Sequence, residues 1–163
     1  MKEVYKRRAY HNGFNGMNKI SEDDINSILK AGMNAPTAMN TKAWEFVVVD
    51  DHDKLQHLAS ATRGTHACAT ASHVIVICVR PDDYAGLNTG IAAENLILEA
   101  THLGIGSLIM GIHHDEAAQT LVKETLKIPS DYTAELMIAF GYPTETLPPN
   151  DYWLPEKIHH NEF

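Results

Sequence analysis

The sequence predicts a mixed α and β protein built around one hydrophobic core. Segments with helical spacing of apolar residues alternate with short apolar runs typical of strands, and no internal repeat is present. The chain has 163 residues, 44% of them hydrophobic, which is enough for one core but cramped for two. We therefore expect residues 1–163 to form a single domain, with residues 142–163 as an extended arm.

Composition argues against several classes of protein. The formal net charge is −8 and no basic run follows Arg8, so we expect no general nucleic-acid binding, which depends on clustered Lys and Arg. The N-terminus lacks the apolar core of a signal peptide, and no apolar run approaches the roughly 18 residues of a membrane span. We expect a cytoplasmic protein with no membrane contact. Cys68 and Cys78 lack CxxC spacing, which favours two reduced core thiols over a disulfide.

The N-terminal third predicts two helices separated by a loop. Residues 2–10 are compatible with a short helix that concentrates positive charge; taken alone, they are typical of a solvated amphipathic end. Turn-forming residues at 12–19 predict a loop. Ser21 as N-cap and apolar residues at helical spacing then predict a helix over 22–33, which Pro36 prevents from continuing.

The middle of the chain predicts two strands and one further helix. β-branched and aromatic residues at 45–49 favour a strand, and Asp50 or Asp51 can cap a short helix after it. The stretch that follows, as far as Thr70, is rich in Ala and Thr and predicts no definite element. Residues 74–79 form a continuous apolar run, which is typical of a central strand.

The rest of the chain predicts a helix, a strand, a helix and a strand, at residues 84–102, 107–110, 115–126 and 134–140. The first of these helices is apolar on more than one face, so it should be buried in the core or against a partner subunit. The arm that follows contains four prolines and several large apolar side chains that need burial. It should therefore wrap over this domain or over a second subunit.

The stretch from 31 to 50 is the strongest indication of function in the residues themselves. It joins a helix end to a strand through a loop of small and hydrogen-bonding side chains. Such a loop lets backbone and hydroxyl groups approach a flat ligand closely, because few large side chains intervene.

Four segments together resemble the nitroreductase family of FMN-dependent flavoproteins: Arg7–His11, Ala35–Trp44, Leu103–Ser107 and Gly141–Pro143. The most specific of them reads Ala-Pro-Thr-Ala-Met-Asn-Thr-Lys-Ala-Trp, and the similarity extends over nearly the whole chain. The resemblance implies an α+β fold with a mainly antiparallel central sheet flanked by helices. It also implies a two-fold homodimer with two FMN sites at the interface, in which residues 142–163 cross to the partner.

The resemblance further implies which N-terminal residues contact the cofactor. Arg7 falls at the position that binds the phosphate, with Arg8 adjacent, so the resemblance favours a phosphate site over a solvated end. His11 stands where the family has a third basic residue and is either a contact at the flavin edge or a simple loop histidine. Ala9 replaces the usual serine, and residues 149–153 lack the basic residue that family members add to the phosphate. We therefore expect either weaker retention of FMN than in the family or a different anchor for its phosphate.

The resemblance also implies site residues in three later parts of the chain: the loop, the long helix and a strand. The matching residues are Pro36, Thr37, Ala38 and Asn40 in the loop, Asn88 in the long helix, and Leu108, Ile109, Met110 and Gly111 in the strand whose backbone passes flavin N5. Asn88 is equally compatible with an exposed polar helix residue. Lys42 stands where the family often has Gln, and Trp44 is expected to pack in the core.

No other catalytic motif competes with this interpretation. The chain has no nucleophile elbow, Walker loop or GxGxxG after a strand, and its histidine pairs at 113–114 and 159–160 lack metal-ligand spacing. We expect no native metal site and no catalytic side chain, because the chemistry resides on the flavin.

The sequence therefore predicts an oxidoreductase that passes electrons from NAD(P)H through FMN to a nitroaromatic, quinone or similar small-molecule acceptor. The alternative, suggested by Ala9, His11 and the missing C-terminal basic residue, is a flavin-binding or small-molecule-binding dimer without efficient turnover.

Overall fold

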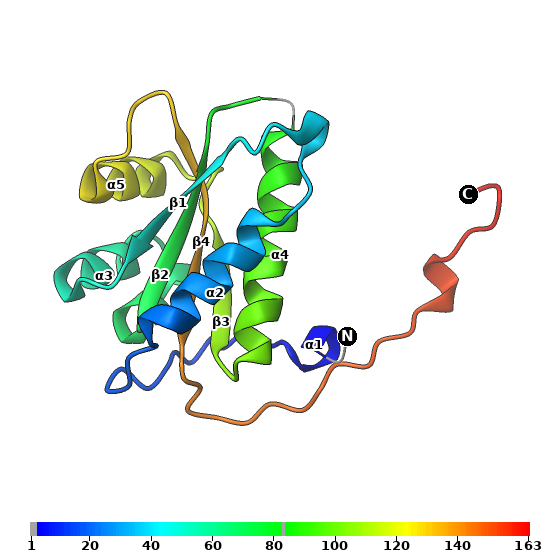
Figure 1. The fold of residues 1–163 in the computed structure, drawn as a ribbon, viewed down its shortest axis with the longest axis horizontal. Coiled ribbons are helices and arrows are strands. Elements are labelled where there is room, and N and C mark those ends of the chain that lie inside the picture. The colour runs from blue at the N-terminus through cyan, green and yellow to red at the C-terminus, as the bar shows by residue number, and fades with distance from the viewer. Residues whose placement is uncertain (1–2, 83) are drawn as a thin grey trace.

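The central feature of the fold is an antiparallel sheet. In the computed structural model, which describes residues 3–82 and 84–163, four strands lie in the order β1 (Trp44–Val49), β2 (His73–Val79), β4 (Thr133–Gly141) and β3 (Gly106–Gly111). All three neighbouring pairs are antiparallel (Figure 1). The predicted α+β class with a mainly antiparallel sheet is therefore confirmed.

Helices cover both faces of this sheet. One face carries α2 (Glu22–Met33) and α4 (Ala85–His102), and the other carries α3 (His52–Ala59) and α5 (Glu116–Leu126) (Figure 1). The side chains of β2 alternate between the two layers: Val74 and Val76 belong to one core cluster, and Ile75 and Ile77 belong to the other. Both faces of β2 are therefore buried, which explains why the sequence of this strand is a continuous apolar run.

Capping side chains begin the helices where the sequence predicts. Ser21, Asp51 and Asp115 each accept a backbone N–H from the first turn of α2, α3 and α5. The stretch for which the sequence predicts no definite element contains η2 (Arg63–Thr70), a 3-10 segment that begins with a capping box at Thr62.

The prediction of a helix over residues 2–10 is wrong beyond Lys6. The helix α1 spans Glu3–Lys6, and the chain then extends along the start of β3. Ala9 forms a parallel bridge with Ser107, and the Tyr10 N–H donates to the Ser107 carbonyl at 3.1 Å. Pairing with the sheet edge satisfies backbone groups that a helix would otherwise satisfy internally. Residue 2 lies outside the described residues.

The long helix α4 packs into the core with its small residues, including Ala92, Ala93 and Ala100, whereas Leu87 is 58% exposed. The expectation of apolar residues on more than one face is confirmed. Within residues 3–82 and 84–163, no helix combines the length and hydrophobicity needed to cross a membrane.

Both cysteines are free thiols inside the core, as predicted. Burial raises the pKa of Cys68 to about 12 and that of Cys78 to about 11, because a thiolate would lose its hydration there.

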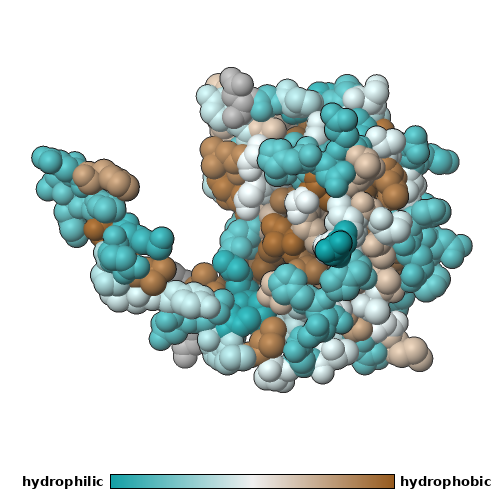
Figure 2. All heavy atoms as spheres, turned by 180° about the vertical axis from the view of Figure 1, so that it is seen from behind, coloured by the Kyte–Doolittle hydropathy of each residue, from teal (hydrophilic) through white to brown (hydrophobic). Residues whose placement is uncertain are grey.

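The chain beyond β4 first follows the body and then leaves it. Residues after 150 project away from the sheet and contain only the short turn η3 (Pro155–Lys157) (Figure 1). Tyr152 and Trp153 are 80% and 74% exposed, and Figure 2 shows apolar residues along this projection as well as on the rear face of the body. On the single chain these side chains stay in water, so their burial requires a second surface.

Candidate functional site

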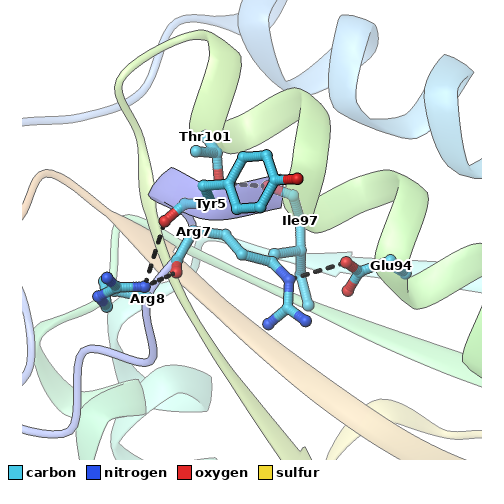
Figure 3. A network of polar contacts seen from close by, with 6 residues as sticks. All are labelled: Tyr5, Arg7, Arg8, Glu94, Ile97 and Thr101. Carbon is cyan, nitrogen blue, oxygen red and sulfur yellow. Dashed lines mark hydrogen bonds and ion pairs between the residues drawn. The ribbon is translucent and has the colours of Figure 1, made fainter. Parts of the chain in front are cut away.

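The basic N-terminal segment, residues 5–15, crosses the end of the sheet between α4 and η2. Arg7 lies on the α4 side, where its Nε is 2.8 Å from Glu94 Oε1; this is an ion pair, although the N–H is not aligned for a hydrogen bond. The two side chains are 43% and 39% exposed, so the pair contributes little to stability, about 0–1 kcal/mol. Figure 3 shows the terminal nitrogens of Arg7 directed away from Glu94, which leaves them able to face an anion.

Arg8 points elsewhere. Its Nη1 donates to the Arg7 carbonyl at 2.7 Å (Figure 3), and its Nη2 donates to the carbonyl of Pro148 in the arm. Arg7 therefore pairs with Glu94 on α4, whereas Arg8 contacts the arm.

A cavity of about 170 Å³ lies between this segment and the start of β3. Its lining includes Lys6, Arg7 and Arg8 together with Ser107 and Pro143. Three cationic side chains around one small cavity, in a chain of net charge −8, favour an anion such as a phosphate group. Because typical ligand pockets measure roughly 300–1,000 Å³, this one suits one end of a ligand rather than a whole flavin.

His11 lies on the other side of β3, in an exposed turn. Its backbone carbonyl is 2.7 Å from Nε2 of His66, which ties the turn to η2. His66 and Glu94 were not among the predicted site residues. No motif or period in the sequence marks them, and only the fold brings them to the basic segment.

The outer edge of β3 is open beyond the Ala9 bridge. The Ser107 carbonyl faces outward to Tyr10, and backbone groups of alternate residues in an antiparallel strand face the same way. Ile109 and Gly111 therefore direct their N–H and C=O groups to this edge. Among the described residues no further strand pairs with it. Gly111 adds no side chain, and Ile109 is 46% exposed, so a flat group can approach the backbone here.

Leu108 and Met110 differ from these two residues. Their side chains are buried in the core and their backbone groups face β4. Leu108 and Met110 therefore hold the strand in place, while Ile109 and Gly111 expose their backbone N–H and C=O groups at its outer edge.

The predicted loop is held in an unusual conformation. Met39, Asn40 and Lys42 have φ values of 51°, 56° and 50°, in the left-handed region that non-glycine residues seldom adopt. Such strain persists only where surrounding contacts over-determine it. Two of those contacts are side-chain hydrogen bonds to backbone amides: Thr37 Oγ1 accepts the Lys42 N–H at 3.0 Å, and Asn88 Oδ1 accepts the Ala38 N–H at 2.8 Å.

Asn88 is thus not an exposed polar helix residue, because it is only 1% exposed. It lies in the first turns of α4, and its hydrogen bond to the Ala38 N–H positions the loop. Pro36 and Asn40 are exposed at the loop surface, and Trp44 is buried as predicted.

The predicted residues form two groups on one chain. The loop and Asn88 lie at the N-terminal end of α4, whereas α1 and the basic segment lie toward its C-terminal end (Figure 1). Along α4, Asn88 lies six positions, about 9 Å, from Glu94, the partner of Arg7, and thirteen positions, about 20 Å, from Thr101, which lines the basic cavity.

Two larger hollows do not involve the predicted residues. One of about 640 Å³ lies along α5 beside His113 and His114, and one of about 410 Å³ lies between α1, α2 and α4. In the part of the chain that the structure describes, no three His, Cys, Asp or Glu side chains are grouped so that they could hold a metal ion.

Comparison with known proteins decides the family. The model of the nitroreductase family matches residues 5–77 and 69–142, which together include the basic segment, the loop and β3. This chain belongs to the nitroreductase family. The match ends where the arm begins, so the arm is outside the part that the family model describes.

Three relatives agree with the nitroreductase assignment. A protein of Archaeoglobus fulgidus, provisionally named an NADH dehydrogenase/NAD(P)H nitroreductase, is 31% identical and covers 100% of this chain and 98% of its own. The structure of an FMN-dependent nitroreductase from Clostridium difficile is 28% identical with a TM-score of 0.92, covering 100% of both chains. A structure from Bacteroides thetaiotaomicron, provisionally named like the first relative, is 27% identical with a TM-score of 0.93, covering 99% of this chain and 96% of its own.

Proposed function

We propose that this nitroreductase-family chain is an FMN-dependent oxidoreductase that passes electrons from NAD(P)H to a nitroaromatic, quinone or similar acceptor. The observation that carries the proposal is the open edge of β3 beside the basic cavity. The edge offers backbone hydrogen-bonding groups, and the cavity at the start of the same strand offers a place for a phosphate. The FMN-dependent relative at 28% identity, which covers the whole chain, supports the same cofactor.

The residues present fit FMN at both ends. Lys6 and the terminal nitrogens of Arg7 would hold the phosphate, and the N–H groups of Ile109 and Gly111 would donate to the ring system. When bound, FMN supplies the redox chemistry, since its isoalloxazine ring accepts a hydride and gives up electrons. The chain contributes orientation: the sheet fixes the β3 backbone, and no side chain has to titrate.

We also propose that a homodimer completes the site. The loop of one subunit would lie over the β3 edge of the other, which would bring Thr37 and Asn40 to the cofactor although on one chain they lie at the opposite end of α4 from the basic cavity. The exposed Trp153 and Tyr152 would be buried on the partner, as in other interfaces rich in aromatic residues.

Removal of the arm tests the dimer. A chain truncated after Tyr142 should lose both dimerisation in sedimentation velocity and FMN retention on a desalting column. A truncated protein that stays dimeric and yellow would refute the role of residues 143–163.

The activity is tested on the purified full-length protein. After incubation with FMN and desalting it should be yellow and show the visible absorbance band of an oxidised flavin. Anaerobic NADH or NADPH should bleach this band, and a quinone or a nitroaromatic should restore it. Protein that takes up no FMN would contradict the proposed function.

A flavin-binding dimer without efficient turnover is the second candidate. Glu94 neutralises part of the charge of Arg7, Arg8 is bound to the arm, and Ala9 offers no hydroxyl. A yellow protein that neither nicotinamide nucleotide bleaches would favour this candidate over the enzyme.

A further inference from the structure

The first residues of the arm, 142–150, run antiparallel to the basic segment, residues 5–15 (Figure 1). The contacts between the two segments show this direction, because residue numbers that rise along the arm pair with residue numbers that fall along the basic segment. They join Asn15 to Tyr142, Phe14 to Pro143, Asn12 to Glu145 and Tyr5 to Asn150. The arm therefore leaves the body along the same segment that carries Arg7 and His11.

Arg8 connects the two segments between these contacts. Its Nη1 donates to the Arg7 carbonyl at 2.7 Å, which Figure 3 shows, and its Nη2 donates to the Pro148 carbonyl, which lies outside that view. A guanidinium is planar and always charged, so it can hold two carbonyl groups in a fixed relative position. One side chain thus fixes the arm next to the backbone of Arg7.

We propose that Arg8 is a positioning residue that fastens the arm to the segment carrying Arg7, so that phosphate binding and arm docking on a partner support each other. A phosphate held by Arg7 orders the segment, and the ordered segment is the surface on which the arm lies. By linkage, the partner engaged by the arm then strengthens phosphate binding by the same factor. The arm contact stands on the hydrogen bonds alone, whereas the coupling to phosphate rests on the proposed function.

Hydrogen–deuterium exchange of the full-length protein without flavin tests the arm contact. In Arg8→Ala, amides around Asn150 should exchange about tenfold faster than in the wild type, because hydrogen bonds from a charged donor are lost. Arg8→Lys keeps the charge but not the fork and should give a smaller increase. Lys30→Ala, which removes an exposed cation from α2, is the matched control and should change nothing. Unchanged exchange in Arg8→Ala, with β2 amides still protected, overturns the proposal.

The dimer dissociation constant tests the coupling. It is measured by sedimentation equilibrium with no flavin, with riboflavin and with FMN, which share a ring and differ in the phosphate. In the wild type, FMN should lower this constant at least about fivefold more than riboflavin, a usual size for coupling between sites. Arg8→Ala should abolish that difference, and Lys30→Ala should retain it. A difference that survives Arg8→Ala overturns the coupling. Wild-type protein that binds neither flavin contradicts the proposed function and the coupling with it, while the exchange measurement still decides the role of Arg8 in fastening the arm.

Discussion

The hydrogen bond between Asn88 and the loop provides the sharpest test of how the site is built. Asn88 Oδ1 accepts the Ala38 N–H at 2.8 Å from a side chain that is 1% exposed. Replacing Asn88 with Ala removes this acceptor and leaves a small cavity under a loop that contains three left-handed residues. The loop should then populate its observed conformation less fully.

The size of the effect follows from burial. A buried donor left unpaired costs about 1–3 kcal/mol, and Ala38 is half-buried, so partial hydration favours the lower part of this range, about 1–2 kcal/mol. For a domain of this length each kcal/mol lowers Tm by about 2–4 °C, which gives a fall of about 2–8 °C. If the loop contacts FMN, the same energy raises the apparent Kd for FMN about 5- to 30-fold.

Thermal unfolding and fluorescence titration with FMN measure the two effects separately. Asn95→Ala is the matched control, because it truncates the same residue type on the same helix. Asn95 Nδ2 donates to the Ala31 carbonyl at 3.1 Å and holds the end of α2 rather than the loop. This variant should lower Tm and leave the Kd for FMN unchanged.

Two results would refute the reasoning. If Asn88→Ala lowers Tm but binds FMN as tightly as the control does, the loop does not belong to the cofactor site. If neither quantity changes, the hydrogen bond to Ala38 does not hold the loop.

Two further predictions concern the core. The free energy of unfolding should fall as the pH rises above about 9, because Cys68 and Cys78 keep their protons when folded and ionise when unfolded, with a slope of up to about 1.4 kcal/mol per pH unit for each thiol. Urea titrations from about pH 8 to pH 10.5 check this, and a double variant with Ala at both positions should show a flatter slope; equal slopes would contradict the assignment. Gly141→Ala should destabilise by about 1–3 kcal/mol, since a Cβ there would lie 2.5 Å from Phe14 Cβ. Gly86→Ala, which meets nothing within 4 Å in α4, should be neutral or stabilise by up to about 1 kcal/mol, and similar thermal shifts in both would contradict the packing argument.

The sequence alone determined the features that depend on neighbouring residues. The N-cap at Ser21, the buried run of β2, and the small-residue loop ahead of Trp44 each follow from local chemistry, and the structure confirms them. The resemblance also predicted the antiparallel sheet correctly. Which residues touch a flavin stays a prediction, since it depends on a cofactor and a second subunit.

Only the tertiary structure decided what each polar side chain does. Asn88 reads as an ordinary helix residue, yet the fold buries it and turns its oxygen to an amide 50 positions away. Arg7 and Arg8 are adjacent and chemically identical, yet one pairs with Glu94 while the other holds the arm. The extended path after Lys6 has the same origin, because the edge of β3 supplies partners that the local sequence does not contain. These roles depend on contacts between residues far apart in the chain, and no spacing or motif within one segment records such contacts.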